Sequence, residues 1–495
     1  MAKKCPVRSL GDICLAELAN LVVSSIGYSL HPDLDNDITV TMVEVNSYLE
    51  NCGATSDIYQ DLLRIILASD YLEASIRFTC LQMLLNGSVQ VLITEIFPYS
   101  YYEKILQVIA AQGSGLRTLN LKGVWVKEDH MHYMFEIIRK CPNLTKLCIP
   151  YIANDDLLDV VAKYSKKLRI VDVSGETDIT EIGIESLCKG LSASRLTMVD
   201  IGMLGEENIC HSDIAMLLEN CPNLENLATY SFVGQALKFV HDNVDQNFKS
   251  RLKYLHDTKT DIETLEIIAK TCPNLESIYL DSPNHGILHK LDGTPLQKLK
   301  IYKFYCNELM DLLEHIGGSM VHLTAIRGHG VLELGRLARL APGLVDLDCY
   351  MMDMLSYNID LRFDCLQGLE ILSSPISLIS LKHFICRSTT LRRLAIDTIA
   401  FGDEDMMSIF GEHEFVFLED IWFTSAVNLT IATVELLMEK CPELQSIGQL
   451  SGWALTPDDL ALIRGLLKSG NSCLNLTTHA RDNLSLNNMG IEEAW

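Results

Sequence analysis

The sequence has few basic residues for its length, which argues against two classes of partner. Its 495 residues include 40 Lys and Arg against 65 Asp and Glu, for a formal net charge of −25. Binding to a nucleic-acid backbone or to an anionic membrane surface needs clustered positive charge. We therefore expect neither nucleic acid nor membrane among the partners of this protein.

Long apolar runs and dense cysteines are also missing. No uninterrupted apolar run approaches the roughly 18 residues that span a bilayer. Asp12 and Glu17 interrupt the first apolar stretch, so we expect no signal-peptide core. The 16 cysteines make up about 3% of the chain, well below the density of a disulfide-stapled secreted module. These features predict a cytoplasmic protein, with the nucleus as a second compartment.

Motifs of catalysis and of metal binding are absent as well. The chain has no G-x-S-x-G elbow, no Walker phosphate loop and no H-E-x-x-H sequence. Its cysteines form no C-x-x-C pair, and His130 and His132 have no third ligand nearby in the sequence. We expect a protein that is not an enzyme and that holds neither a metal nor a cofactor.

What the sequence does contain is a repeat of the form Leu-x-x-Leu-x-Leu, with about 25 residues from one copy to the next. Copies begin at Val89, Leu116, Leu144, Leu168, Leu196, Leu224, Leu252, Leu275, Leu296, Leu344, Leu366, Leu391, Leu418 and Leu444, with a degraded copy near Met320. Several copies are preceded by Cys-Pro-Asn-Leu or Cys-Pro-Glu-Leu, beginning at Cys141, Cys221, Cys272 and Cys441. Because proline cannot continue a helix, this phrase predicts a switch from helix to strand, with the cysteine in the core.

One such unit cannot bury its leucine row alone, but stacked units share a continuous core. The predicted fold is an α/β leucine-rich repeat solenoid, a curved horseshoe with a parallel sheet on its concave face and helices on its convex face. We assign residues 86–468 to about 14 repeats, residues 1–85 to a small helical N-terminal region and residues 469–495 to a polar C-terminal tail. The repeats resemble the cysteine-containing type found in cytosolic F-box/LRR proteins.

The N-terminal region begins with a stretch, residues 8–26, that is expected to form an amphipathic helix. Its apolar residues fall on or near one stripe: Leu10, Ile13, Cys14, Leu18, Leu21, Val22 and Ile26. Leu10, Cys14 and Leu18 stand four residues apart and should face the same side. The segment from Ser9 to Leu18 resembles the BC-box of elongin-dependent ubiquitin-ligase receptors. With the repeats, it is similar to receptors of the zyg-eleven and zer-one type.

The resemblance implies that Leu10, Cys14 and Leu18 bind an adaptor protein. The family's second box, which selects the cullin, has only a loose counterpart in Leu30-His31-Pro32-Asp33-Leu34, and the chain has no room for the family's armadillo repeats. An F-box-like domain is the second docking mode, although its later tryptophan is missing because the first one is Trp125. The remaining alternative is that the helix only caps the open end of the repeat stack.

Strand alternation sends the third, fifth and seventh residues of each repeat to the concave face. Reading those positions gives a candidate partner-binding set: Tyr230, Tyr254, His256, Tyr279, Lys298, Lys300, Tyr302 and Tyr350. Asp172, Asp200, Arg393 and Trp422 are further residues of the same face. Tyrosine joins a broad apolar ring to a hydroxyl and is a common binding anchor. It is also a good strand residue, so the alternative is that these rings merely fill their positions.

Together these features predict a substrate-recognition subunit of a cullin-RING ubiquitin ligase. It would bind an adaptor, either elongin C or the F-box adaptor, through its N-terminal helix and would present a protein substrate on the concave face. A strongly acidic solenoid with capped ends is expected to be a monomer outside that complex. The alternative is a non-catalytic scaffold or inhibitor of the ribonuclease-inhibitor-like type.

Overall fold

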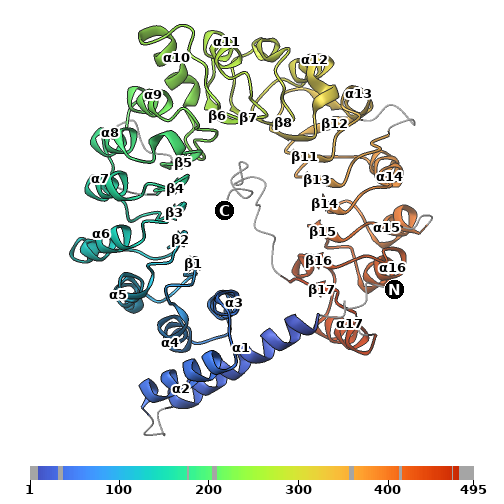
Figure 1. Ribbon diagram of the computed structural model, residues 1–495. Helices are drawn as coiled ribbons and strands as arrows, with labels where there is room; N and C mark the ends of the chain where they lie inside the picture. Colours follow the sequence, from blue (N-terminus) through green and yellow to red (C-terminus); the bar gives the residue numbers. More distant parts are fainter. Residues whose placement is uncertain are drawn as a thin grey trace. The chain divides into compact units, whose positions relative to one another are not determined.

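A computed structural model describes residues 9–31, 37–175, 178–202, 209–355, 362–411, 415–470 and 472–478. The chain divides into two compact units. We call residues 7–251 the N-terminal unit and residues 252–495 the C-terminal unit. Each unit contains strands that alternate with helices along the chain (Figure 1).

The N-terminal unit starts with four helices before its first strand. Its helices are α1 Leu10–Ser29, α2 Ile38–Asn51, α3 Ser56–Leu67, α4 Ala74–Leu84, α5 Tyr102–Gln112, α6 Met131–Lys140, α7 Asp155–Tyr164, α8 Glu181–Lys189, α9 His211–Asn220 and α10 Val233–Asn243. Its strands are β1 Val91–Ile93, β2 Thr118–Asn120, β3 Lys146–Cys148, β4 Ile170–Asp172 and β5 Met198–Asp200. These strands form one parallel sheet in chain order.

The C-terminal unit continues the strand and helix alternation to the end of the described chain. Its strands are β6 Tyr254–Thr258, β7 Ser277–Asp281, β8 Lys298–Tyr302, β9 His322–Ile326, β10 Val331–Glu333, β11 Asp346–Tyr350, β12 Asp353–Leu355, β13 Gly368–Leu372, β14 Arg393–Asp397, β15 Asp420–Thr424, β16 Ser446–Gly448 and β17 Asn475–Leu476. Its helices are α11 Ile262–Thr271, α12 Cys306–Ile316, α13 Leu334–Leu340, α14 Leu378–Arg387, α15 Asp403–Phe410, α16 Ile431–Lys440 and α17 Pro457–Ser469.

A ten-stranded parallel sheet runs through this unit in the order β6-β7-β8-β9-β11-β13-β14-β15-β16-β17, and β10 pairs with β12 separately. In each unit the repeat helices lie on one face of the sheet (Figure 1). We call the opposite face the open face. The predicted α/β leucine-rich repeat solenoid is confirmed, because nearly every repeat adds one parallel strand to the sheet and most add a helix behind it.

The predicted repeat register is confirmed almost throughout. The sheet strand begins two residues after the leucine that opens the repeat, as in the repeats of Leu252, Leu275 and Leu391, whose leucines are at most 1% exposed. The repeat that opens at Leu224 is different, because it forms only an isolated bridge between Asn226 and Met198.

Strand length differs between the two sheets. The strands of the N-terminal sheet have three residues each, whereas most strands of the ten-stranded sheet have five. Strands β2, β4 and β5 end at Asn120, Asp172 and Asp200. Each of these side chains accepts a hydrogen bond at 2.9 Å from the backbone N–H two residues further on. Such a turn competes with continued strand pairing.

The N-terminal helices differ from the expectation in two respects. The first helix runs from Leu10 to Ser29, so it begins later and ends later than residues 8–26. The small helical region expected over residues 1–85 contains three further helices, α2, α3 and α4, which the sequence did not delimit. Residues 32–36, which include most of the cullin-box candidate Leu30-His31-Pro32-Asp33-Leu34, lie outside the described residues.

Part of the predicted polar tail belongs to the sheet. Within residues 469–495, Asn475 and Leu476 form β17 and pair in parallel with Ser446 and Ile447 of β16. The backbone hydrogen bonds of an added strand stabilise this segment even though its polar side chains predicted a tail. Residues 471 and 479–495 lie outside the described residues.

The recurring cysteines are core residues, as predicted. Cys141, Cys221, Cys272 and Cys441 are each at most 1% exposed and follow directly after a repeat helix. Burial raises the pKa of the Cys141 thiol to about 11, so it stays protonated, and it donates a hydrogen bond to the Gly113 carbonyl at 3.1 Å.

Candidate functional site

Helix α1 has apolar residues on two faces. Ala19, Val22 and Ile26 are at most 4% exposed and pack within the N-terminal unit, where α1 contacts α2, α3 and α4. The other face is uncovered, with Leu10 76%, Leu21 60% and Tyr28 65% exposed. The expectation of a single stripe is therefore wrong, because Val22 and Ile26 lie on the buried face while Leu10 and Leu21 lie on the exposed one.

The three predicted adaptor-binding residues do not share one environment. Leu10 and Cys14 are exposed, and Ile13 beside them is 44% exposed. Leu18 is half-buried. At 100° per residue, Leu18 is turned about 80° from Leu10, which places it at the edge of the exposed face rather than at its centre.

Helix α3, rather than α1, covers the edge of the N-terminal sheet. The Gln60 side chain accepts hydrogen bonds from the backbone N–H groups of Gln90 and Val91 at 3.1 and 2.9 Å, and donates to the Val91 carbonyl at 2.6 Å. These bonds satisfy backbone groups that an edge strand leaves open. Gln60 thus covers the open backbone groups of β1, while α1 packs against α3 and α4 behind it.

Among the residues that the structure describes, α1 is the one helix long and apolar enough to cross a membrane, with a mean hydropathy of 1.4. Asp12 and Glu17 interrupt its apolar run, as the sequence showed, but they leave its mean hydropathy high. Buried core helices and signal sequences meet the same criterion, so composition alone does not distinguish a span from a docking helix.

Six of the predicted partner-binding residues lie together on the open face of β6, β7 and β8. We call them the tyrosine–lysine patch: Tyr254, His256, Tyr279, Lys298, Lys300 and Tyr302. The His256 and Tyr279 rings stack with centroids 4.2 Å apart and an interplanar angle of 23°. The Lys300 Nζ lies 4.8 Å from the Tyr279 ring centre on the next strand. Pairing across adjacent strands thus aligns the three fifth-position residues.

Burial changes the protonation of this row. It lowers the pKa of His256 to about 3, with a further contribution from the positive charge of Lys300. It also lowers the pKa of Lys300 to about 8, against the opposing influence of Asp348. At neutral pH the His256 ring is neutral, and Lys300 is mostly charged.

Tyr350 and Tyr230 are not part of this patch. Tyr350 lies on β11, two strands beyond β8, and is 2% exposed. Tyr230 belongs to the N-terminal unit, outside any strand, and is 3% exposed. Its hydroxyl is 3.2 Å from the His211 Nδ1. Like His256 and Tyr279 of the patch, the two rings are buried where the prediction expected exposed anchors.

Beyond the tyrosine–lysine patch, the open face carries a network of ion pairs that the sequence analysis did not identify. Asp346 of β11 is 2.8 Å from the His322 Nδ1 and 2.6 Å from the Arg393 Nη2 on β14. Burial alone would raise the pKa of Asp346, but His322 and Arg393 outweigh it and hold the pKa below its usual range. The ion pair with Arg393 crosses β13 over Gly368, where a Cβ would lie 2.0 Å from the Asp346 Oδ1.

At the fifth repeat position of β11 and β13, two carboxylates lie next to each other. Asp348 pairs in register with Glu370, and burial followed by the charge of Glu370 raises the pKa of Asp348 to about 7. Thr324 donates a hydrogen bond to Asp348 at 3.1 Å. Glu370 is the fifth residue of the repeat that opens at Leu366, so the repeat register already contained the signal for this pair.

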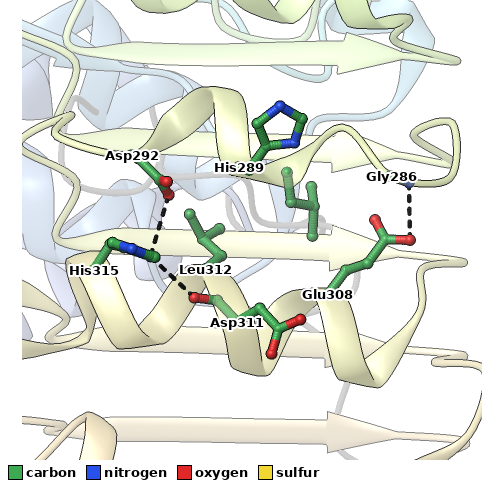
Figure 2. A pocket seen from close by; sticks show the side chains of 8 residues that line it. Gly286, His289, Asp292, Glu308, Asp311, Leu312 and His315 are labelled. Atoms are coloured by element: carbon green, nitrogen blue, oxygen red, sulfur yellow. Dashed lines mark hydrogen bonds and ion pairs between the residues drawn. The ribbon is translucent and has the colours of Figure 1, made fainter.

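A cavity of about 230 Å³ lies on the helical side of the C-terminal unit, between α12 and the short 3-10 helix η4 Leu288–Leu291. Figure 2 shows His315 between Asp292, at 3.5 Å, and the Asp311 carbonyl, at 3.2 Å. Glu308 accepts a hydrogen bond from the Gly286 N–H at 2.9 Å. In the described ranges, no group of three or more acidic, histidine or cysteine side chains is arranged to hold a metal ion. Because the polar groups here bond to the protein itself, we assign no site to the cavity.

Comparison with known proteins adds a fold likeness only. No protein-family model and no curated protein matches the chain. The chain resembles the crystal structure of a Rad7 and Elc1 complex in yeast at 12% identity and a TM-score of 0.40, over 92% of this chain and 96% of that chain. It also resembles the crystal structure of a TLR13–ssRNA13 complex at 12% identity and a TM-score of 0.36, over 80% of this chain and 66% of that one. At this identity and these TM-scores, neither likeness indicates what the chain binds.

Proposed function

We propose that this leucine-rich repeat protein is a substrate-recognition subunit of a cullin-RING ubiquitin ligase. Helix α1 binds the adaptor, either elongin C or the F-box adaptor, and the open face of the C-terminal sheet binds the protein substrate. The protein performs no chemistry itself and works in the cytoplasm, the nucleus or both.

One observation carries the proposal: the apolar outer face of α1 is exposed although its inner face is packed. A cap needs only the packed face, and the sheet edge is already covered by Gln60 of α3. Exposed apolar side chains spaced along one helix face are typical of a helix that enters a partner's groove. Leu10 and Cys14 stand one turn apart on that face, as the BC-box resemblance requires.

The experiment is capture of purified full-length chain by immobilised elongin C and, in parallel, by the F-box adaptor. We expect capture of the wild type by one of the two. Leu10→Ser and Cys14→Lys should each reduce capture at least tenfold, because each removes or blocks a central apolar contact. Tyr71→Ser is the matched control, since Tyr71 is 99% exposed between α3 and α4 and should not matter.

The outcomes are distinct. Circular dichroism and thermal unfolding must show that the variants fold like the wild type. If neither adaptor captures the wild type, the ligase proposal is wrong and the scaffold or inhibitor alternative remains. Equal loss with Tyr71→Ser would show nonspecific adhesion instead of docking through α1.

The composition of α1 supports a second candidate, in which this helix inserts into a lipid bilayer. Sedimentation with neutral phosphatidylcholine vesicles separates the two. Retention on the vesicles, lost in Leu21→Asp but not in Tyr71→Ser, would favour the membrane. Adaptor capture without vesicle binding would favour the ligase.

A further inference from the structure

The tyrosine–lysine patch has a charge opposite to that of the whole chain. On the open face, the third and fifth positions of β6, β7, β8 and β9 hold Tyr254, His256, Ser277, Tyr279, Lys298, Lys300, His322 and Thr324. None of these is a carboxylate, in a chain with a formal net charge of −25. Asp257 of β6 is 0% exposed, and Asp281, at the seventh position of the repeat that opens at Leu275, accepts a hydrogen bond from the Ser282 hydroxyl at 2.7 Å.

His256 supplies a second, independent observation. Its side chain is 3% exposed, and neither ring nitrogen has a hydrogen-bond partner among the described residues. The great majority of buried polar side-chain atoms in folded proteins have such a partner. The neutral ring offers one N–H donor and one acceptor. A buried histidine with both nitrogens unsatisfied points to an atom that a bound partner provides.

The groups around His256 are suited to an anion. Lys300 lies over the Tyr279 ring, which itself stacks on His256, so the ammonium and the imidazole border the same ring. Burial of Lys300 weakens its charged form, and an anion placed beside it would restore that form. At the edge of the patch, Arg327 donates a hydrogen bond to the Tyr302 hydroxyl at 3.1 Å, which leaves the phenol proton for another acceptor.

The neighbouring part of the same sheet would repel such an anion. Asp348 on β11 and Glu370 on β13 occupy the fifth positions of their repeats, two and three strands beyond Lys300. With strands about 4.8 Å apart, these carboxylates begin roughly 10 Å from the lysine row. An acidic group is therefore favoured over β6, β7 and β8 and disfavoured beyond β9.

We propose that the tyrosine–lysine patch binds an acidic segment of the partner protein, with Asp or Glu carboxylates of that segment at Lys300 and at His256, on either side of the Tyr279 ring. One carboxylate accepts a hydrogen bond from the Lys300 ammonium and another from the His256 N–H, and the tyrosine rings contact the flanking side chains. This inference deepens the proposed function, because it names the chemistry of the segment that the open face recognises.

The test measures binding of a fluorescein-labelled peptide, Gly-Ser-Glu-Tyr-Glu-Glu-Ser-Gly, to the full-length chain by fluorescence anisotropy. Its twin has Gln in place of every Glu, so it keeps the shape and loses the charge. We expect the acidic peptide to bind at least tenfold more tightly than the twin, since charge-assisted hydrogen bonds are lost in the amide. Equal binding of both, or no binding of the acidic peptide up to about 1 mM, would overturn the inference.

Variants then locate the site. Lys300→Met keeps the length of the side chain without its charge and should weaken binding of the acidic peptide at least tenfold. His256→Phe keeps a flat ring without nitrogens and should weaken binding severalfold. Lys122→Met, which removes an exposed lysine from the N-terminal unit, is the matched control and should leave affinity within twofold. Should Lys300→Met fail to fold, Lys298→Met tests the same prediction from the neighbouring position.

Two further arms separate the alternatives. A further peptide carries phosphoserine in place of the central Glu. If it binds more than tenfold more tightly than the Glu peptide, the preferred ligand is a phosphate and this proposal is overturned. Leu10→Ser, which should abolish adaptor capture, should leave peptide binding unchanged. Adaptor capture without peptide binding would leave the proposed function standing and remove only this inference.

Discussion

The two sheets share one leucine framework but use the fifth position of the repeat differently. In three of the five N-terminal strands this position holds Asn120, Asp172 or Asp200, which accept a backbone hydrogen bond where the strand ends. On β6, β7, β8, β9, β11 and β13 of the C-terminal sheet it holds His256, Tyr279, Lys300, Thr324, Asp348 and Glu370, and these strands continue for two more residues. Where the side chain bonds to its own turn, its acceptor is already used. Where the strand continues, the side chain makes no such turn and contacts its neighbours on adjacent strands instead.

The largest expected difference between the two sheets comes from truncating one fifth-position carboxylate in each of them. Asp172 is 7% exposed and accepts hydrogen bonds from the Ser174 N–H and hydroxyl and from the Cys148 thiol. Asp172→Ala should lower the free energy of unfolding by about 3 kcal/mol, because buried donors lose their acceptor. Asp348→Ala should change it by less than about 0.5 kcal/mol at pH 7, since Asp348 is already penalised by burial.

Urea unfolding of both variants measures the contrast, with Asp172→Asn as the control that keeps an acceptor for the turn. We expect Asp172→Asn to recover most of the loss. Similar losses in the free energy of unfolding for Asp172→Ala and Asp348→Ala would show that the fifth-position residues stabilise both sheets. That result would weaken the case for recognition on the C-terminal sheet.

The second prediction concerns the ion pair that crosses β13. Gly368→Ala places a methyl group 2.0 Å from the Asp346 Oδ1 and 3.1 Å from the Arg393 Nη2. The two side chains must separate, and we expect a loss of about 2 kcal/mol in the free energy of unfolding. Gly465→Ala in α17 is the matched control, because its new methyl group meets nothing within 4 Å. Helix propensity should make that control more stable by about 0.5 to 1 kcal/mol.

If Gly368→Ala is as stable as the wild type, the crossing ion pair does not contribute, and Arg393 becomes a further candidate for partner contact. A double variant, Gly368→Ala with Arg393→Met, should lose no more than Gly368→Ala alone, because the first change has already broken the pair.

The third and smallest prediction uses pH to compare a fifth-position carboxylate of each sheet. Burial raises the pKa of Asp200 to about 6, with the charge of Asp172 adding to it, and that of Asp348 to about 7. A carboxyl with a raised folded-state pKa stabilises the fold at low pH, and this contribution is lost as pH rises through the folded-state value. Asp200→Asn and Asp348→Asn cannot ionise and should gain about 1 kcal/mol per pH unit relative to the wild type over that range.

The gain should level off near pH 6 for Asp200→Asn and near pH 7 for Asp348→Asn. Urea midpoints measured from pH 4.5 to pH 8.5 give both curves. A difference from the wild type that stays constant with pH would contradict the raised values, and a gain that appears as pH falls would reverse their sign.

Much of the fold could be predicted because the leucine spacing is tied to the geometry of one repeat. Strand starts followed from the leucines, and the buried cysteines followed from the Cys-Pro phrase. The repeat at Leu224 keeps its leucine but forms only an isolated bridge. Its own residues do not indicate that the strand is missing. Helix α2 was not delimited because it buries only Leu49, while Val40 and Val43 remain exposed, so its apolar residues give little periodic signal.

The candidate sites were predictable in part. The repeat register identified the neighbours Tyr279, Lys300 and His256, because adjacent strands in a parallel sheet align equal positions. It could not show that Tyr230 and Tyr350 are buried, since exposure depends on what packs above the ring. The contact between Asp346 and Arg393 skips a strand, which only a glycine at the intervening position permits.

By itself, the sequence determined the repeat, the direction of the sheet and the residues offered to its open face, because a strand's two-residue alternation is a local property of the chain. The tertiary structure decided which of those residues remain accessible and which of them pair. Burial, ion pairs across strands and the coverage of a sheet edge arise between segments that are distant in the chain. For the same reason, the exposed face of α1 became visible only once α2, α3 and α4 had taken up the other side of the helix.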